Sequence, residues 1–301
     1  MPSFRSRTVR FAIRNSNFMN GKSGTIAEQR GMTDVAARLL RTPGGVAIQK
    51  ARAGTVPGEW IVPKDSPADR ALLYMHGGGF IFGSLATHRA LIARLADSAG
   101  IRAFSVEYRL APEHPFPAAL DDSLEAYRGL VQDGITPDKI IVAGDSAGGN
   151  LALALILSLK KAGDALPAAA VCISPVTDML WTGSSMRTKA GVDPIFPEGG
   201  SSPMGTSIHA DYIRSADPRD PLISPLYGDM RGMPPVLLHV GEDEVLLDDS
   251  ARLAERVRAA GGHAELVVWS GMWHVFQVFA PFVPEAAQSI RQMGEFIRTL
   301  H

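Results

Sequence analysis

A short apolar run, a glycine-rich turn and a long apolar run follow one another directly in this chain, and this succession limits the possible folds most. Residues 140–143 predict a buried parallel strand, and residues 151–159, hydrophobic on every face, predict a buried helix. The turn between them is Gly144-Asp-Ser-Ala-Gly148, which has the form G-x-S-x-G. Its small residues let strand and helix cross closely and hold the hydroxyl of Ser146 out at the edge of the sheet. The stretch therefore predicts a nucleophile elbow.

The same turn also fits an ordinary connection in which the serine only caps the helix. Two other features favour the nucleophile. His76-Gly-Gly-Gly79 follows the apolar run 71–75 upstream, and an acidic cluster and then His274 follow downstream. A serine, an acid and a histidine in this chain order, with an upstream HGGG segment, form the arrangement of α/β-hydrolases. We therefore predict that Ser146 and His274 are catalytic.

Residues 144–150 and His76-Gly-Gly-Gly79 closely resemble the corresponding motifs of the hormone-sensitive-lipase-like family of bacterial esterases. The resemblance runs from about Ile61 to the C-terminus and implies an α/β-hydrolase fold, in which helices flank a mostly parallel central sheet. In that family a helical cap covers the active site. The resemblance implies that residues 1–45 and the insertion 175–221 build this cap, and that residues 46–174 and 222–301 form the two parts of the catalytic core.

Apolar runs and turn residues predict parallel strands that alternate with helices, the pattern of a doubly wound sheet. Strands are expected at residues 46–50, 59–62, 71–75, 101–107, 140–143, 168–174, 236–240 and 264–269, and helices at 33–41, 88–99, 118–133, 151–159, 250–260 and 284–300. Thr33 is expected to cap the first helix. Residues 175–221 are rich in glycine and proline with only 208–215 helix-like, and so long an irregular segment is unusual unless it is a functional lid.

The three glycines after His76 free the backbone to point several N–H groups at one place. In α/β-hydrolases an HGGG-type loop supplies one oxyanion donor, and the residue after the nucleophile, here Ala147, supplies another. From the family resemblance we expect Gly78 and Gly79 to provide the donors of the loop. The alternative is that the glycines form only a flexible loop.

The acid of the triad is expected in the cluster 242–249, after the strand 236–240. The usual pattern of the family there is Asp-x-Leu-x-Asp-Glu. Aligning its Leu-x-Asp with residues 246–248 places the catalytic position at Glu244, so this sequence carries Glu where Asp is usual. Either acid works in α/β-hydrolases. Asp243 is the alternative, and because adjacent residues after a strand point to roughly opposite sides, only one of the two should face the histidine.

Other acids and histidines are expected to have structural roles. Asp248 and Asp249 should cap the helix 250–260. His239 lies inside the apolar run 236–240 and is expected to be a hydrogen-bonded core residue. The sequence pattern supplies no acid or nucleophile as a partner for the remaining candidates, which are His88, His114, His209 and His263.

Composition limits the partners and the cellular setting. The 301 residues are 46% hydrophobic, enough for one large α/β domain with an insertion. A net charge of −1 gives no long-range field, so we expect no nucleic-acid or membrane partner and a small, neutral substrate. Cys172 is the single cysteine and cannot form an internal disulfide, which favours a cytoplasmic protein. The arginine-rich N-terminus would also fit a transit peptide, although a solvated surface is the simpler interpretation.

No cofactor and no metal are expected. Gly21-Lys22-Ser23 looks like the end of a phosphate loop, but Ser16 stands where the first glycine of that motif belongs. The sequence also has no GxGxxG after a strand, no HExxH and no CxxC. The predicted chemistry therefore depends on protein side chains alone.

These residues predict a serine carboxylesterase that hydrolyses short-chain carboxylic esters through an acyl-enzyme intermediate. A lipase or an amidase would use the same triad. The alternative from another class is a non-catalytic small-molecule receptor of the same fold, in which the triad is incomplete. Ala264–Trp269 is expected to be an apolar edge strand, and we expect a two-fold homodimer through it.

Overall fold

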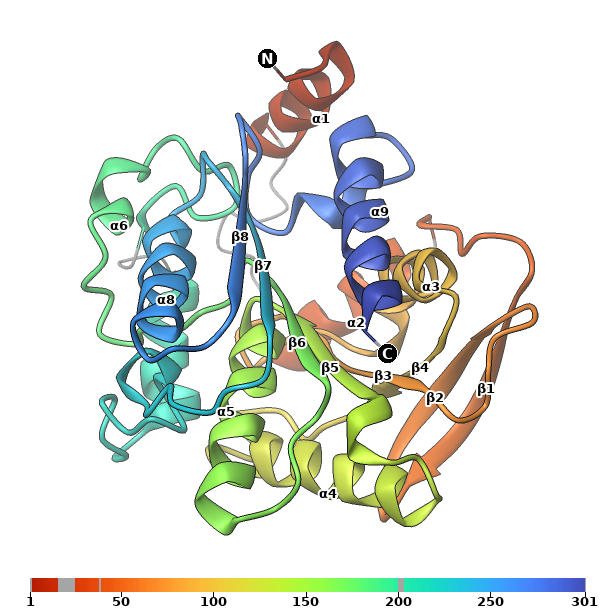
Figure 1. Ribbon diagram of the computed structural model, residues 1–301. Helices are drawn as coiled ribbons and strands as arrows, with labels where there is room; N and C mark the ends of the chain where they lie inside the picture. Colours follow the sequence, from red (N-terminus) through yellow and green to blue (C-terminus); the bar gives the residue numbers. More distant parts are fainter. Residues whose placement is uncertain (1, 16–24, 38, 200–202, 301) are drawn as a thin grey trace.

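The structure, a computed structural model, describes residues 2–15, 25–37, 39–199 and 203–300, and across these residues it has an eight-stranded sheet (Figure 1). The strands are β1 (Val46–Ala53), β2 (Val56–Pro63), β3 (Ala71–Met75), β4 (Arg102–Val106), β5 (Ile140–Asp145), β6 (Ala169–Ile173), β7 (Val236–Gly241) and β8 (Ala264–Trp269). They lie in the order β1-β2-β4-β3-β5-β6-β7-β8. β2 runs antiparallel to β1 and β4, and the other neighbours are parallel. The prediction of a mostly parallel sheet is confirmed.

Helices cover both faces of the sheet (Figure 1). One face carries α3 (Leu85–Ala99) and α9 (Pro284–Thr299), and the other carries α4 (Ala118–Gln132), α5 (Ala147–Ala162) and α8 (Leu247–Ala259). Alternate residues of a strand enter different cores. Leu72 and Tyr74 of β3 share a core with α3 and α9, whereas Leu73 and Met75 share one with α4, α5 and α8. Burial on both faces explains why strands such as β5 are continuously apolar.

The predicted strands are all present, and the differences in their bounds are local. β1 and β2 each run farther toward their hairpin than predicted, because Gly54, at a φ of +58°, and Thr55 make the turn alone. Helix α5 begins at Ala147 rather than at residue 151, since the small residues after Ser146 already form its first turn.

The N-terminal segment differs from the prediction of one helix at 33–41 capped by Thr33. It contains α1 (Phe4–Asn15) and α2 (Ile26–Ala37). The hydroxyl of Thr33 lies inside α2 and donates to the carbonyl of Arg30. Arg30 ties α2 to the rest of the molecule, because its guanidinium pairs with Glu113 at 2.9 Å and donates to two distant carbonyls. The start of α2 is set locally by Thr25 and Glu28, because the hydroxyl of Thr25 accepts the N–H of Glu28 at 3.3 Å and Glu28 accepts the N–H of Thr25 at 2.7 Å.

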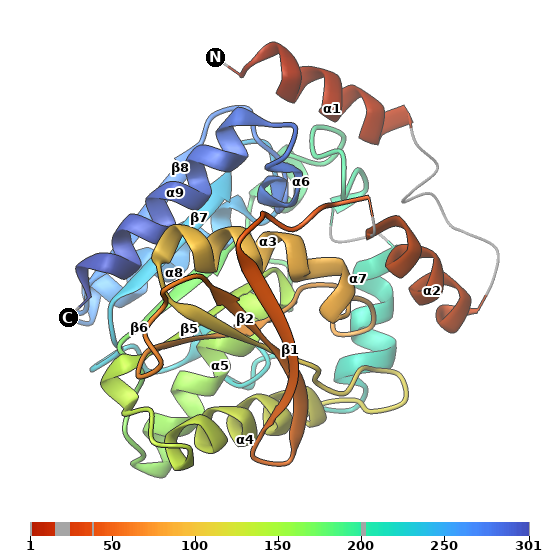
Figure 2. The ribbon, with the colours of Figure 1, turned by 90° about the vertical axis from the view of Figure 1, so that its right-hand side faces the viewer.

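The insertion between β6 and β7 is largely irregular, as predicted. Its short helical pieces are α6 (Ser185–Thr188), α7 (Pro203–Ser207), the π-helical η3 (Ile208–Ile213) and the 3-10 helix η4 (Pro225–Tyr227). Outside the insertion, the chain forms the 3-10 helices η1 (Pro137–Lys139) and η5 (Phe276–Phe279). Figure 2 shows α1, α2 and α7 along one side of the molecule. This arrangement fits a cap built from both segments, and the division into residues 1–45, 46–174, 175–221 and 222–301 stays a prediction.

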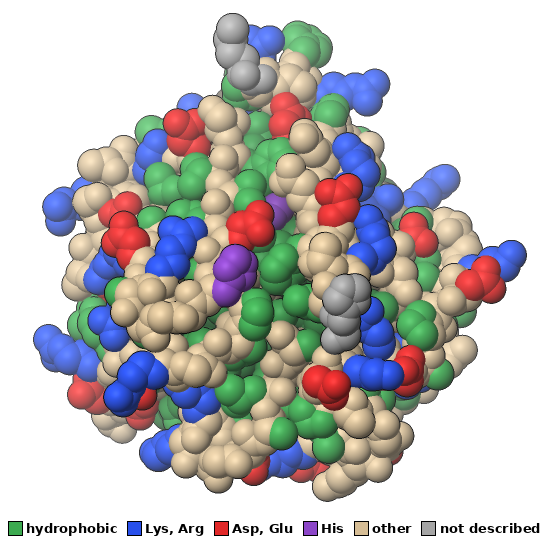
Figure 3. Space-filling model, in the orientation of Figure 1, with side chains coloured by type: hydrophobic (Ala, Val, Ile, Leu, Met, Phe, Trp, Pro, Cys, Tyr) green, Lys and Arg blue, Asp and Glu red, His purple; other side chains and the backbone are tan. Residues whose placement is uncertain are grey.

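The outer surface carries charges of both signs. On the face drawn in Figure 3, lysines and arginines are interspersed with acids, and no patch of one sign covers that face. β8 forms one edge of the sheet, as predicted, and β1 forms the other. Among the helices in the described ranges, none is both long and apolar enough to cross a membrane.

Candidate active site

Ser146 sits in a strained turn between β5 and α5. Its φ of +53° lies in the left-handed region, which costs a serine about 1–3 kcal/mol. Strand and helix approach so closely that a Cβ on Gly148 would lie 2.0 Å from the carbonyl oxygen of Met75. A Cβ on Gly144 would lie 2.3 Å from the backbone of Gly148. The G-x-S-x-G pattern is therefore a steric requirement of this crossing, which holds Ser146 at the carboxyl end of β5 with 7% of its surface exposed.

The HGGG loop after β3 lies beside this turn. Gly78 and Gly79 have φ angles of +123° and +63°, which favour glycine. Gly77 donates its N–H to Oδ1 of Asp145 in the elbow at 3.1 Å. Within the described residues, the N–H groups of Gly78, Gly79 and Ala147 donate to no acceptor. The predicted oxyanion donors are thus available, and their role stays a prediction.

His274 and Glu244 face each other on the loops after β8 and β7. Nδ1 of His274 lies 3.3 Å from Oε1 of Glu244, and both side chains are buried. The second carboxylate oxygen, Oε2, accepts hydrogen bonds of 2.7 and 2.8 Å from the N–H of Gly241 and the hydroxyl of Ser174. Because these contacts fix its orientation, the carboxylate can hold the imidazole in one tautomer.

Asp243 points to the opposite side. It pairs with Arg10 at 2.6 Å and with Lys189 at 3.4 Å, and about a fifth of its side chain is exposed, at 21%. The alternation expected of adjacent residues therefore holds. The structure brings Glu244, and not Asp243, to the histidine, while the catalytic role of Glu244 stays a prediction.

The surroundings of His274 favour its protonated form. Burial by itself lowers the pKa of the imidazole. The hydrogen bond to Glu244 and the negative charges of Glu244, Asp193 and Asp145 outweigh burial, so the pKa of His274 is raised above its ordinary value of 6.5. A raised pKa makes the neutral imidazole a stronger proton acceptor. The histidine is thus suited to take a proton from a hydroxyl.

Ser174 is a site residue that the sequence did not indicate. It follows β6 with a φ of +46° and is fully buried. While its hydroxyl donates to Glu244, the same oxygen accepts the N–H of Val275 at 3.2 Å. One side chain thus links the loops after β6, β7 and β8. Its partners lie 70 and 101 positions away in the chain, so local sequence carries no signal for this contact.

The expectation that His88 has no acid partner is wrong. Nε2 of His88 lies 3.2 Å from Oδ2 of Asp145, whose other oxygen accepts from the hydroxyl of Tyr74 and the N–H of Gly77. The imidazole also stacks on His76, with 5.3 Å between the ring centroids. Residues 88 and 145 are 57 positions apart, so this pair arises from the packing of α3 against the elbow.

His239 is a buried core residue, as predicted. Its Nδ1 lies 2.8 Å from the hydroxyl of Ser289 and accepts the indole N–H of Trp269 at 3.1 Å. Burial lowers the pKa of His239 to about 3, so its imidazole is neutral. His209 has a carbonyl partner, that of Met179 at 2.7 Å, rather than an acid.

Asp248 and Asp249 do not cap the following helix, contrary to prediction. α8 begins at Leu247, and its first residues have no side-chain cap. Asp249 accepts the N–H of Thr177 at 2.7 Å, and Asp248 accepts the N–H of Ser185 at 3.0 Å. Both carboxylates therefore bind the insertion to helix α8 by accepting hydrogen bonds from the backbone of the insertion.

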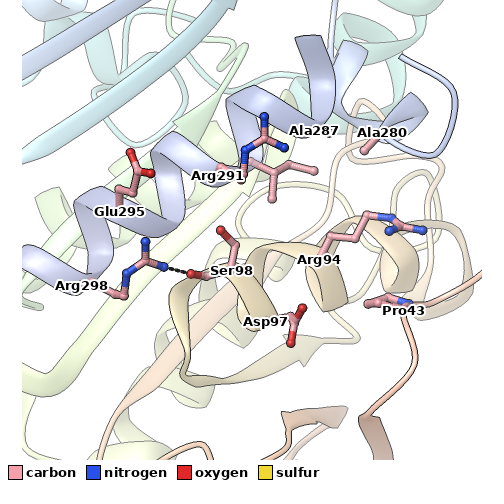
Figure 4. Close-up of a pocket in the computed structure, with 10 residues that line it drawn as sticks. Pro43, Arg94, Asp97, Ser98, Ala280, Ala287, Arg291, Glu295 and Arg298 are labelled. Carbon is pink, nitrogen blue, oxygen red and sulfur yellow. Dashed lines mark hydrogen bonds between the residues drawn. The ribbon is translucent and has the colours of Figure 1, made fainter. Parts of the chain in front are cut away.

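A separate groove of about 440 Å³ runs between α3 and α9 (Figure 4). Half of its lining residues are charged, and these are Arg94, Asp97, Arg291, Glu295 and Arg298. None of the predicted catalytic residues lines this groove. In the part of the chain that the structure describes, no three metal-binding side chains gather in a metal site.

Known proteins share this architecture. A model of the α/β-hydrolase fold matches residues 72–278, a range that includes the HGGG loop, the elbow, Glu244 and His274. The crystal structure of an esterase from the bacterial hormone-sensitive lipase family is similar over 100% of this chain and 99% of that chain, with a TM-score of 0.94 and 40% identity. The chain belongs to this family. Both the resemblance stated from the motifs and the predicted fold are confirmed.

Two further relatives match over most of their length. An acetyl-hydrolase of Streptomyces hygroscopicus is 37% identical over 92% of this chain and 91% of its own. An esterase of Acinetobacter venetianus is 38% identical over 90% of this chain and 88% of its own. The two alignments therefore each cover nine-tenths of this chain or more.

Proposed function

We infer that this chain is a carboxylic ester hydrolase. The observation that supports this most is the buried His274–Glu244 pair, on the loops that follow β8 and β7 at the edge of the sheet where the strained turn presents Ser146. Each member of a serine hydrolase triad then has a residue in a suitable place. A non-catalytic receptor on the same fold would have no need of a buried, hydrogen-bonded pair of this kind.

The first half of the reaction forms an acyl-enzyme. Nδ1 of His274 faces Glu244, so Nε2 takes the proton from the hydroxyl of Ser146 as Oγ attacks the ester carbonyl carbon. The carbonyl π pair moves to oxygen and creates an oxyanion. When the carbonyl re-forms, the bond to the alcohol oxygen breaks, and His274 gives its proton to that oxygen.

The oxyanion is stabilised by backbone donors. The N–H groups of Gly78, Gly79 and Ala147 are the candidates, and each such donor contributes on the order of 10²–10³ in rate. Water then attacks the acyl-enzyme with His274 as its base, and the acid leaves as Ser146 regains its proton. The residues present supply every proton transfer in the cycle.

We propose that the substrates are small, neutral esters of short carboxylic acids. Phe196 of the insertion lies edge-on to the ring of His274, with 4.9 Å between the centroids, and so occupies space beside the imidazole. The name acetyl-hydrolase, carried by the Streptomyces relative, also points to short acyl groups.

A panel of p-nitrophenyl esters tests this proposal. We expect kcat/KM to be highest for acetate or butyrate and to fall through octanoate to palmitate. Activity that is highest on long-chain emulsions and rises at an oil surface would support a lipase instead. Hydrolysis of the matching anilides at a similar rate would support an amidase.

We also propose a homodimer that pairs β8 of two copies. β8 is an edge strand, and Val268 on it is 46% exposed although it is apolar. Light scattering at micromolar concentration should give twice the chain mass, and a monomer would contradict the proposal. We further propose that the protein works in the cytoplasm, consistent with a free and buried Cys172.

A further inference from the structure

A second buried carboxylate stands next to the His274–Glu244 pair. Asp193 belongs to the insertion between β6 and β7, and only 1% of its surface is exposed. Its Oδ2 accepts the N–H of Val245, the residue after Glu244, at 3.1 Å. Its Oδ1 accepts the N–H of Ile195 at 2.9 Å. The carboxylate therefore connects the insertion to the acid loop.

The charges of this carboxylate and of His274 act on each other. Burial raises the pKa of Asp193 to about 6, with the charge of His274 opposing the rise and that of Glu244 adding to it. In the other direction, Asp193 acts together with Glu244 and Asp145 to raise the pKa of His274. A buried carboxylate next to an imidazole favours the imidazolium.

Neighbouring contacts hold Asp193 in this place. Arg10 of α1 donates to the carbonyl of Val192 at 2.8 Å and, through its other terminal nitrogen, to Asp243 at 2.6 Å. Phe196, three residues after Asp193, packs its ring against His274. The insertion, α1 and the acid loop thus meet around one carboxylate.

We propose that Asp193 is a positioning residue for the His274–Glu244 pair: its carboxylate holds the backbone of the acid loop and places a second negative charge near the imidazolium that forms when His274 takes up a proton. The effect of this charge on catalysis rests on the proposed function. Its effect on the pKa of His274 does not depend on that function. The two can therefore be tested separately.

Asp193→Asn removes the charge and keeps one acceptor oxygen. NMR titration of the His274 imidazole should show its pKa falling by about one unit, the size expected from removal of one nearby opposite charge. The acidic limb of the pH profile of kcat/KM should move to lower pH by the same amount, and kcat at its plateau should fall by about tenfold. Asp193→Glu, which retains the charge, should keep the pKa of His274 near that of the wild type.

Asp217→Asn is the matched control. Asp217 lies in the same insertion and accepts the N–H two residues ahead at 2.9 Å, as Asp193 does, but it is exposed and is not one of the charges that raise the pKa of His274 most. The control should leave the pKa of His274 unchanged. An equal shift in the control, or no shift in a folded Asp193→Asn protein, would overturn the proposal.

The wild-type protein offers a second readout that needs no variant to fold. The chemical shift of His274 should show an additional inflection near pH 6, where Asp193 takes up its proton. Its absence would also count against the proposal. If the pKa of His274 shifts as expected while the wild type hydrolyses no ester, the positioning role stands and the proposed function fails.

Discussion

The hydroxyl of Ser174 donates a 2.8 Å hydrogen bond to Oε2 of Glu244, the carboxylate oxygen that does not lie beside Nδ1 of His274. Ser174 also accepts the N–H of Val275, so it acts on the backbone next to the histidine as well. A single buried side chain thereby aligns two loops that carry the proposed acid and base.

Ser174→Ala should lower kcat/KM by about 10- to 100-fold, because a hydrogen bond to a charged group contributes about 1.5–3 kcal/mol. Steady-state kinetics on a short p-nitrophenyl ester would measure the loss. Ser184→Ala is a matched control, since Ser184 makes a 2.6 Å hydrogen bond to Asp248 away from the pair, and it should leave the activity unchanged. Full activity in the Ser174→Ala variant would show that the orientation of Glu244 does not depend on the hydroxyl of Ser174.

Glu244→Gln and Asp243→Asn should differ sharply in kcat. The glutamine variant loses the negative charge beside His274, and its kcat should fall by about 10³ to 10⁴, as for the equivalent change in a serine protease. The asparagine variant changes a residue that pairs with Arg10 and Lys189, so its kcat should stay near that of the wild type. The reverse result would make Asp243 the acid of the triad.

Activity should decline as the pH falls below the pKa of His274, which lies above 6.5. His274 must be neutral to accept a proton, and its pKa lies above the ordinary 6.5 because the effects of Glu244, Asp193 and Asp145 outweigh that of burial. As the pH drops below that pKa, the imidazole becomes protonated and kcat/KM falls about tenfold for each further unit. Circular dichroism at each pH would separate this loss from unfolding. A decline in kcat/KM with a midpoint well below pH 6.5 would contradict the conclusion that these charges raise the pKa of His274.

Features that leave a pattern in consecutive residues were predictable from the sequence. The strands are short apolar runs because helices bury both faces of the sheet, and the G-x-S-x-G turn must use small residues because a Cβ on Gly148 would strike the carbonyl of Met75. The choice of Glu244 over Asp243 followed from the family pattern, and the alternation of side chains after a strand agrees with it.

Features that depend on distant contacts were not predictable. The guanidinium of Arg30 in α2 binds Glu113 and the carbonyl of Ile81, which lie 83 and 51 positions away in the chain. The pairing of His88 with Asp145 also depends on how a helix packs against the sheet. Asp193 and Ser174 act on residues 52 to 101 positions away, so no spacing rule could have found them.

Covalent labelling of Ser146 tests the esterase assignment most directly. An organophosphonate should inactivate the wild-type protein and leave one adduct on the tryptic peptide that contains Ser146. Ser146→Ala, if it is folded by circular dichroism, should take up no label, and its kcat should be lower by on the order of 10⁶. Labelling of the Ser146→Ala protein to the same extent as the wild type, or unchanged ester hydrolysis by it, would show that Ser146 is not the nucleophile.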